Sequence, residues 1–219
     1  MLRRAIMAFV VLCLVVPAVA QGPMQGPPVF RGVWSPVVGS GAAYQVETNR
    51  EKREMEMAVV GTEAHEGKTG HWLEIFMKDP RQGDVVMKML IVLDGSNTRS
   101  MRMVMQTQEM GPIEMPISLM DRGGRGQTVN EADFREKAER VGTESITTQA
   151  GTFTCEHYRN KEDGTDIWVA EKIAPYGMVK MTSKDGTTMI LTRVISGAKT
   201  RITGTPQKFD PGAMMRERP

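Results

Sequence analysis

Three methionines, Met101, Met103 and Met105, occupy every second position of one short stretch. Alternate side chains of an extended strand point to the same face, so the three thioethers would share a surface. Because methionine is unbranched and polarizable, such a surface can fill irregular gaps in a core or adapt to an apolar ligand of variable shape. Thioether sulfur also suits Cu(I), and exposed methionine is oxidised reversibly. The spacing therefore allows core packing, an apolar ligand site, a Cu(I) site or oxidant scavenging.

The same alternation recurs on two earlier segments, around residues 55–57 and 87–89. If these segments pair in one sheet, their methionines form a thioether-rich apolar face, and nearby aromatic side chains would extend it. A Cu(I) site is disfavoured because alternate residues on one strand are about 6.6 Å apart and Arg102 would repel a cation. The predicted ligand-lining residues are Met55, Met57, Trp72, Met87, Met89, Met101, Met103, Met105, Phe153 and Trp168.

Cys155 and His157 also share a strand face and could form half of a metal site or a nucleophile with its base. No CxxC or HExxH motif and no other nearby histidine completes either arrangement, so a buried thiol beside an edge histidine is the preferred interpretation. The Gly39-Ser40-Gly41 stretch lacks the strand, elbow and helix context of a hydrolase nucleophile. We therefore expect no enzyme activity, no catalytic residues, no metal site and no cofactor.

The first 20 residues combine two arginines, an apolar run from Ala5 to Val16 and the small-residue pattern Ala18-Val19-Ala20. This pattern predicts a secretory signal peptide cleaved before Gln21, and so a periplasmic or secreted protein. The apolar run is shorter than the roughly 20 residues that span a bilayer, so we expect no stable membrane insertion after cleavage. Loss of Arg3 and Arg4 lowers the basic residues from 28 to 26, against 26 acidic residues. Such a neutral chain has no charge excess for binding nucleic acid.

Removal of the signal peptide also leaves Cys155 as a single cysteine, so no intramolecular disulfide can form and burial of apolar surface must hold the fold. About 200 residues suffice for one domain. The Pro- and Gly-rich composition of both ends predicts a flexible leader over 21–33 and a flexible tail over 210–219. The domain itself is predicted to span 34–209, with an insert at 110–140 that is too long for an ordinary hairpin loop.

Period-two alternation dominates the domain and predicts about ten strands. Asp94-Gly95, Asp163-Gly164 and Asp185-Gly186 lie between strand-like runs, where they favour tight turns and hence antiparallel pairing. Only the insert departs from this pattern, and its end, at 130–138, is a plausible short helix. The fold class is therefore mainly β: a single antiparallel sheet with a short helix or loop as a cover.

Four stretches together resemble a known family: Ser40 to Val46, His71 to Ile75, Gly142 to Phe153 with its AGTF sequence, and Asp166 to Val169. The chain is similar to exported bacterial proteins that carry a domain of unknown function, and through them to the LolA/LolB-like lipoprotein-carrier half-barrel superfamily. The resemblance implies a strongly curved sheet, or half-barrel, with an apolar cavity for acyl chains and no catalytic residues.

The expected function is accordingly that of an exported binding protein whose partner is a hydrophobic small molecule or lipid. Two alternatives remain open at this point. One is a methionine-rich Cu(I)-binding or redox-buffering protein of the periplasm. The other is a structural or interaction module of the cell envelope that has no ligand.

Overall fold

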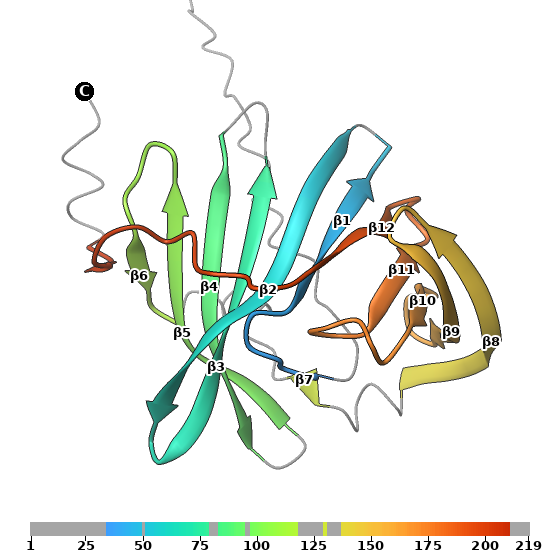
Figure 1. The fold of residues 1–219 in the computed structure, drawn as a ribbon, viewed down its shortest axis with the longest axis horizontal. Coiled ribbons are helices and arrows are strands. Elements are labelled where there is room, and N and C mark those ends of the chain that lie inside the picture. Colours follow the sequence, from blue (N-terminus) through green and yellow to red (C-terminus); the bar gives the residue numbers. More distant parts are fainter. Residues whose placement is uncertain are drawn as a thin grey trace, which may run out of the picture.

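The computed structural model describes residues 34–49, 51–78, 83–94, 97–117, 129–130 and 137–210. The described chain is mainly β and forms one open, curved sheet (Figure 1). The predicted signal peptide, leader and tail beyond 210 lie outside these residues. The strands are β1 (Gly41–Glu47), β2 (Lys52–His65), β3 (Lys68–Lys78), β4 (Val85–Asp94), β5 (Asn97–Thr107), β6 (Ile113–Met115), β7 (Val129–Asn130), β8 (Ala138–Thr148), β9 (Gly151–Asn160), β10 (Asp166–Val169), β11 (Met178–Thr182), β12 (Thr188–Ile195) and β13 (Gln207–Lys208).

Two antiparallel meanders make up the sheet. Strands β1 to β6 pair in chain order, strands β8 to β12 do the same, and pairing of β1 with β12 joins the two halves. Sequential strands pair because short connections leave them adjacent in space. The short strand β7 pairs with β5 outside this row, and β13 pairs with β6 in parallel. The expected curved antiparallel sheet is confirmed, with this parallel pair as an exception.

The predicted turn residues lie where two hairpins reverse direction. Gly164 and Gly186 have φ angles of 67° and 85°, which glycine adopts without the steric cost that a side chain would bring. The Asp185 side chain accepts hydrogen bonds from Ser183 and Thr187 and so closes the second turn. The third predicted turn, after Asp94, has its glycine outside the described residues. The turn between β2 and β3 was not predicted.

Four strands were missing from the sequence prediction: β1, β6, β7 and β13. The last three contain two or three residues each, too few for a periodicity to be detected. Strand β1 does alternate apolar residues, but glycine and two alanines at its start weaken the signal. The beginning of the segment predicted as an insert supplies β6. Most of the predicted helix at 130–138 lies outside the described residues, and its two ends belong to β7 and β8.

The main apolar core lies against one face of β1–β3 and the adjoining strands β11 and β12. Tyr44, Leu73 and Leu191 are at most 1% exposed within it. The connection between β10 and β11 covers part of this core, because Ile173 and Tyr176 belong to the same cluster. The Tyr44 hydroxyl donates a hydrogen bond of 3.0 Å to the carbonyl oxygen of Met178, and burial raises the pKa of this hydroxyl.

The other face of the sheet is crossed by the chain between β12 and β13, residues 196–206, which we call the strap. It runs in front of β2–β5 to reach β6 at the far side (Figure 1). The Gln106 side chain on β5 bonds to Thr203 of the strap, and the N–H of Gln207 donates to Pro112 just before β6. The strap therefore links the end of the second meander to the edge of the first. Among the described residues, no helix has the length and apolarity needed to cross a membrane.

Candidate functional site: the methionine face

The strand register brings methionines of five strands to one face of the sheet. Residues paired directly across strands point to the same side, so each row of pairs can be followed from strand to strand. We call the surface formed by three such rows, from β2 to β6, the methionine face. Its methionines are Met55 and Met77 in the first row, Met57, Met87 and Met105 in the second, and Met89, Met103 and Met115 in the third.

Six of the predicted lining residues therefore share this face: Met55, Met57, Met87, Met89, Met103 and Met105. Sequence reasoning missed Met77 and Met115. The missing signal was strand pairing, because Met77 was read only as part of an alternating run and Met115 belongs to a strand of three residues. Between the methionines the rows hold only uncharged side chains, such as Leu73 and Ile75.

The methionine face is fully buried on β2 and mixed from β3 to β6, where Met87 and Met103 are 9% and 7% exposed. Met55 and Met57 are 2% and 0% exposed and belong to the main core. Farther along, Met89, Met105 and Met115 are only half-buried. The β2 end of the face is therefore core packing, whereas the β4–β6 end keeps thioether surface in contact with solvent.

Met101 does not continue the row of Met103 and Met105. A bulge between β4 and β5 pairs Leu90 with Arg102 and Ile91 with Ser100, so Met101 has no partner in the register. A bulge places an extra residue on one strand and turns the following side chains. The regular spacing in sequence thus breaks at its first methionine.

Trp72 lies on the opposite face, which we call the strap face. It pairs with Leu90, and its indole N–H donates a hydrogen bond of 3.1 Å to Glu63. The ammonium of Lys88 lies 4.6 Å from the centroid of the Trp72 ring. The guanidinium of Arg102 also lies against this ring, at 5.4 Å, and bonds to Glu63. The two cations that flank the methionines in sequence therefore project away from them.

Trp168 is also turned away from the methionine face. It pairs with Lys180, and the same row of cross-strand pairs runs through Ile190 and Gln45 to Glu54 on β2. Glu54 is the neighbour of Met55 in the strand, so its side chain points to the opposite face. The ammonium of Lys180 lies 4.5 Å from a centroid of the indole. Phe153 lies on β9 in the second meander, where it packs on the edge of the core cluster. Trp72 lies on the strap face, whereas Trp168 and Phe153 lie in the second meander and contact the core cluster that also contains Met55 and Met57. The ligand-lining role of all ten residues stays a prediction.

His157 lies at the centre of a polar cluster in the second meander. It is 6% exposed, and its ring stacks on Trp168 at 4.3 Å between centroids. Its Nδ1 lies 2.7 Å from Glu144 Oε1 and its Nε2 lies 2.8 Å from Asp166 Oδ1. Sequence reasoning paired His157 with Cys155 and missed both carboxylates, which come from β8 and β10.

The carboxylates of this cluster are held in their charged form. Hydrogen bonds from Trp168, at 3.0 Å, and then from His157 lower the pKa of Glu144. Burial alone would raise the pKa of Asp166, but hydrogen bonds from Arg159 and His157 outweigh it, so this pKa is also lowered. Trp168 donates to Glu144 and Arg159 donates to Asp166 whichever ring nitrogen of His157 carries the proton, so the cluster ties β8, β9 and β10 together.

Cys155 is fully buried. Its sulfur lies 3.6 Å from the carbonyl oxygen of Phe153, and burial, followed by the nearby charge of Glu144, raises the pKa of the thiol. A raised pKa disfavours the thiolate, which is the reactive form. The geometry agrees with a packed thiol. Among the described residues, histidine, cysteine and carboxylate side chains form no group of three that could hold a metal ion.

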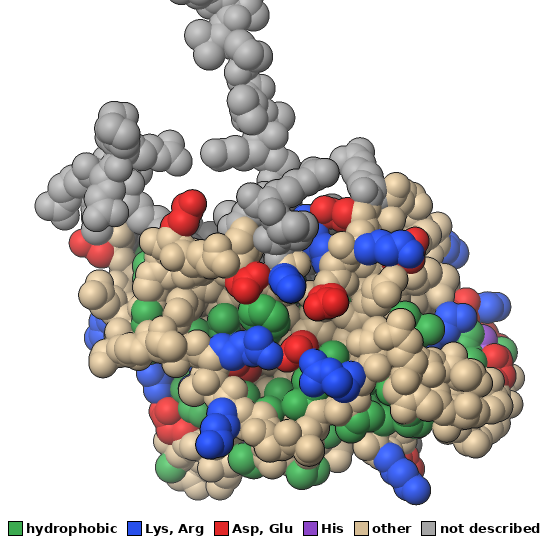
Figure 2. All heavy atoms as spheres, turned by 45° about the horizontal axis from the view of Figure 1, so that its top comes forward, with side chains coloured by type: hydrophobic (Ala, Val, Ile, Leu, Met, Phe, Trp, Pro, Cys, Tyr) green, Lys and Arg blue, Asp and Glu red, His purple; other side chains and the backbone are tan. Residues whose placement is uncertain are grey.

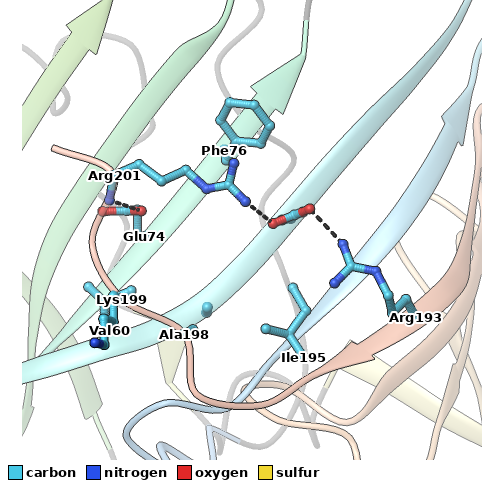
Figure 3. Close-up of a pocket in the computed structure, with 10 residues that line it drawn as sticks. Val60, Glu74, Phe76, Arg193, Ile195, Ala198, Lys199 and Arg201 are labelled. Carbon is cyan, nitrogen blue, oxygen red and sulfur yellow. Dashed lines mark hydrogen bonds and ion pairs between the residues drawn. The ribbon is translucent and has the colours of Figure 1, made fainter.

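A cavity of about 140 Å³ lies on the strap face, between the strap and strands β2, β3 and β12. Figure 3 shows Arg201 extended along it, with its guanidinium 4.0 Å from the centroid of Phe76. Glu56 accepts hydrogen bonds from both Arg193 and Arg201. The lining residues are Glu56, Ala58, Val60, Glu74, Phe76, Arg193, Ile195, Ala198, Lys199 and Arg201. This cavity is small and its lining is half charged and half apolar, so it differs from the apolar cavity that the sequence predicted.

The surface around the sheet carries charges of both signs. Figure 2 shows acidic and basic side chains intermingled on one side of the molecule, with hydrophobic side chains between them. Several of these charges form ion pairs, among them Arg102 with Glu63 and Glu114. Mixed charge of this kind agrees with the near balance of acidic and basic residues in the sequence.

The fold places the chain among mainly β proteins built on one open, curved antiparallel sheet. It belongs to the family described as "Domain of unknown function (DUF4412)", which matches residues 44–206. The expected membership of a family with a domain of unknown function is confirmed, whereas the relation to lipoprotein carriers stays a prediction. A search among curated proteins found no match.

The solved structures to which this chain is similar include three proteins. A candidate lipoprotein from Parabacteroides distasonis ATCC 8503 is 11% identical, with a TM-score of 0.37 over 75% of this chain and 98% of that chain. A candidate exported protein with a YmcC-like fold from Bacteroides fragilis NCTC 9343 is 12% identical, with a TM-score of 0.40 over 75% and 99%. MucB is 9% identical, with a TM-score of 0.38 over 76% and 57%.

Proposed function

We propose that this protein is an exported, non-enzymatic binding protein that takes up an apolar ligand, such as a lipid or an acyl chain, on its methionine face. The observation that carries the proposal is the incomplete burial of that face beyond β2. A face meant only for packing would be covered throughout, whereas Met89, Met105 and Met115 are half-buried. The rows at the β4–β6 end hold no charged side chain, so they suit an uncharged part of a ligand.

The physical basis is the removal of thioether and aliphatic surface from water. Burial of apolar surface stabilises a complex by about 25 cal/mol for each Å² covered, before the costs of association. Methionine has three rotatable side-chain bonds, so it can adjust to acyl chains of different length and saturation. The buried β2 end of the face, where Met57 is 0% exposed, would anchor the half-buried thioethers of the β4–β6 end.

Export follows from the amino-terminal sequence rather than from the sheet. Residues 1–20 have the charged, apolar and small-residue regions of a signal peptide. In this proposal the mature chain meets its ligand outside the cytoplasm. Its single cysteine, Cys155, is buried and has no second cysteine with which to form an internal disulfide there.

Native mass spectrometry of the protein purified from its own periplasm tests the proposal. We expect a co-purifying lipid or fatty acid, or uptake of an added fatty acid by the empty chain. Met105→Gln and Met115→Gln should weaken this uptake, because each puts a polar amide on the half-buried part of the face. Val141→Gln is the matched control, since Val141 is 49% exposed on β8, outside the methionine face.

Recovery of a consistently empty chain that takes up neither fatty acid nor phospholipid would contradict the proposal. Equal uptake by wild-type protein and both glutamine variants would place any ligand elsewhere on the molecule.

A further inference from the structure

The third row of the methionine face places three thioethers on neighbouring strands. Met103 on β5 pairs directly with Met89 on β4 and with Met115 on β6. The Cβ atoms of such pairs are about 4.5–5.5 Å apart, closer than alternate residues of one strand. Because the sulfur lies two bonds beyond Cβ on a flexible chain, the three sulfurs can turn toward one centre. Met105 lies one row away and is a possible fourth ligand.

In the sequence, Arg102 lies beside the methionines and would repel a bound cation, but in the fold its charge is on the other face of the sheet. Arg102 follows Met101 in the chain, yet its guanidinium bonds to Glu63 and Glu114 on the strap face, at 2.6 and 2.7 Å. Lys88 likewise lies over Trp72 on that face. The third row itself, from Val59 and Leu73 to Met115, holds no charged residue.

Access to this row is graded. Met103 is 7% exposed, whereas its two partners Met89 and Met115 are half-buried. A small ion could therefore reach the centre of the row past the outer thioethers and be shielded from water once bound. Thioethers are soft and uncharged, so they favour Cu(I) over Mg²⁺, Ca²⁺ or Zn²⁺.

We infer that the row formed by Met89, Met103 and Met115 binds one Cu(I) ion through its thioether sulfurs. This inference goes beyond the proposed uptake of an apolar ligand and does not depend on it. Both would use the β4–β6 end of the methionine face, but only metal binding requires sulfur.

Titration of the signal-free chain with Cu(I), under anaerobic conditions and against a chromophoric Cu(I) chelator, tests the inference. We expect one tightly held Cu(I) ion per chain. The buried thiol is the competing ligand, so the titration is repeated with Cys155→Ala, which should keep the site. Met103→Leu and Met115→Leu should each weaken Cu(I) binding by about tenfold or more, because they remove a soft ligand at nearly constant volume.

Met55→Leu is the matched control, since it removes a thioether from the same face but from the first row. Fatty-acid uptake by the wild-type chain, measured without metal, separates the two proposals, because Cu(I) binding by a chain that takes up no fatty acid would support the metal site alone. If Met103→Leu fails to fold, methyl NMR of wild-type methionines with Ag(I), a redox-stable analogue, still reports on the site. The methyl groups of Met89, Met103 and Met115 should shift and those of Met55 and Met57 should not.

Three results of the titrations would overturn the inference. They are the absence of competitive Cu(I) binding, unchanged binding after both leucine substitutions, and loss of binding in Cys155→Ala. A Ag(I)-induced shift confined to other methionines would overturn it as well.

Discussion

The backbone N–H of Arg201 donates a hydrogen bond of 2.9 Å to Glu74 on β3, across a separation of 127 residues. The other carboxylate oxygen of Glu74 accepts the hydroxyl of Thr200 at 2.5 Å. Glu74 is only 4% exposed, so the strap covers its own anchor. Leaving a buried charged group without hydrogen-bond partners is costly. These bonds to Glu74 therefore contribute more to stability than an exposed ion pair would.

We therefore predict that Glu74→Leu loosens the strap while the sheet stays folded. Hydrogen bonds to a charged group contribute about 1.5–3 kcal/mol, so local opening should increase by about tenfold or more. Limited trypsin digestion measures this opening as cleavage after Lys199 and Arg201. Glu54→Leu is the control, because Glu54 is an exposed carboxylate on neighbouring β2. Equal cleavage rates in the two variants would show that Glu74 does not anchor the strap.

The two ends of the methionine face should differ in their contribution to stability. Met57→Ala removes a side chain that is 0% exposed, so it should lower the free energy of unfolding by about 2–5 kcal/mol. Met105→Ala truncates a half-buried side chain in the same row and should cost about 1 kcal/mol. Urea denaturation followed by circular dichroism measures both. Similar losses would mean that the face is packed equally along its length.

Close contact between β1 and β2 requires glycine at position 41. A Cβ atom there would lie 2.3 Å from the carbonyl oxygen of Met57 and 2.6 Å from the Cβ of Ala58. Gly41→Ala should therefore destabilise the protein by about 1–3 kcal/mol. Gly61→Ala, on β2, is the matched control, because no atom lies within 4 Å of its added Cβ. Thermal unfolding of the two variants tests the difference, and equal melting temperatures would contradict it.

The polar cluster around His157 should make stability depend on pH on the acid side. The pKa of Asp166 is lower in the folded protein than its ordinary value of 3.8, so the unfolded chain binds protons first as pH falls. Its contribution is complete above that value and is lost as pH falls through the folded pKa. Asp166→Asn should flatten the loss of stability between about pH 5 and pH 3, measured by urea denaturation. Arg159→Met should flatten it partly, because Arg159 donates to Asp166.

An unchanged slope in Asp166→Asn would assign the acid sensitivity to other carboxylates. Glu114 is a candidate, since hydrogen bonding to Arg102 also lowers its pKa.

Much of the sheet was predictable because its signals are local. The run through Trp72, Leu73 and Glu74 alternates in the structure as in the sequence, with Leu73 in the core and Trp72 on the strap face. Aspartate-glycine pairs marked two hairpins for the same reason, since a tight turn is determined by a few consecutive residues.

The candidate site was predictable only in part. Period two shows which residues of one strand share a face, but it does not show which face two strands have in common. Trp72 was therefore grouped with the methionines, although pairing with Leu90 turns it away from them. A shift of register by one residue exchanges the two faces, and the bulge beside Met101 has a similar local effect.

The amino-acid sequence alone determined the mainly β class, the alternation within each long strand and the predicted signal for export, because each depends on neighbouring residues. The tertiary structure decided that Met89, Met103 and Met115 form one row, that Arg102 faces away from it, and that Glu74 holds the strap. These relationships join residues far apart in the chain. They depend on register, bulges and chain crossing, which are selected by burial and hydrogen bonding over the whole sheet rather than by any local pattern.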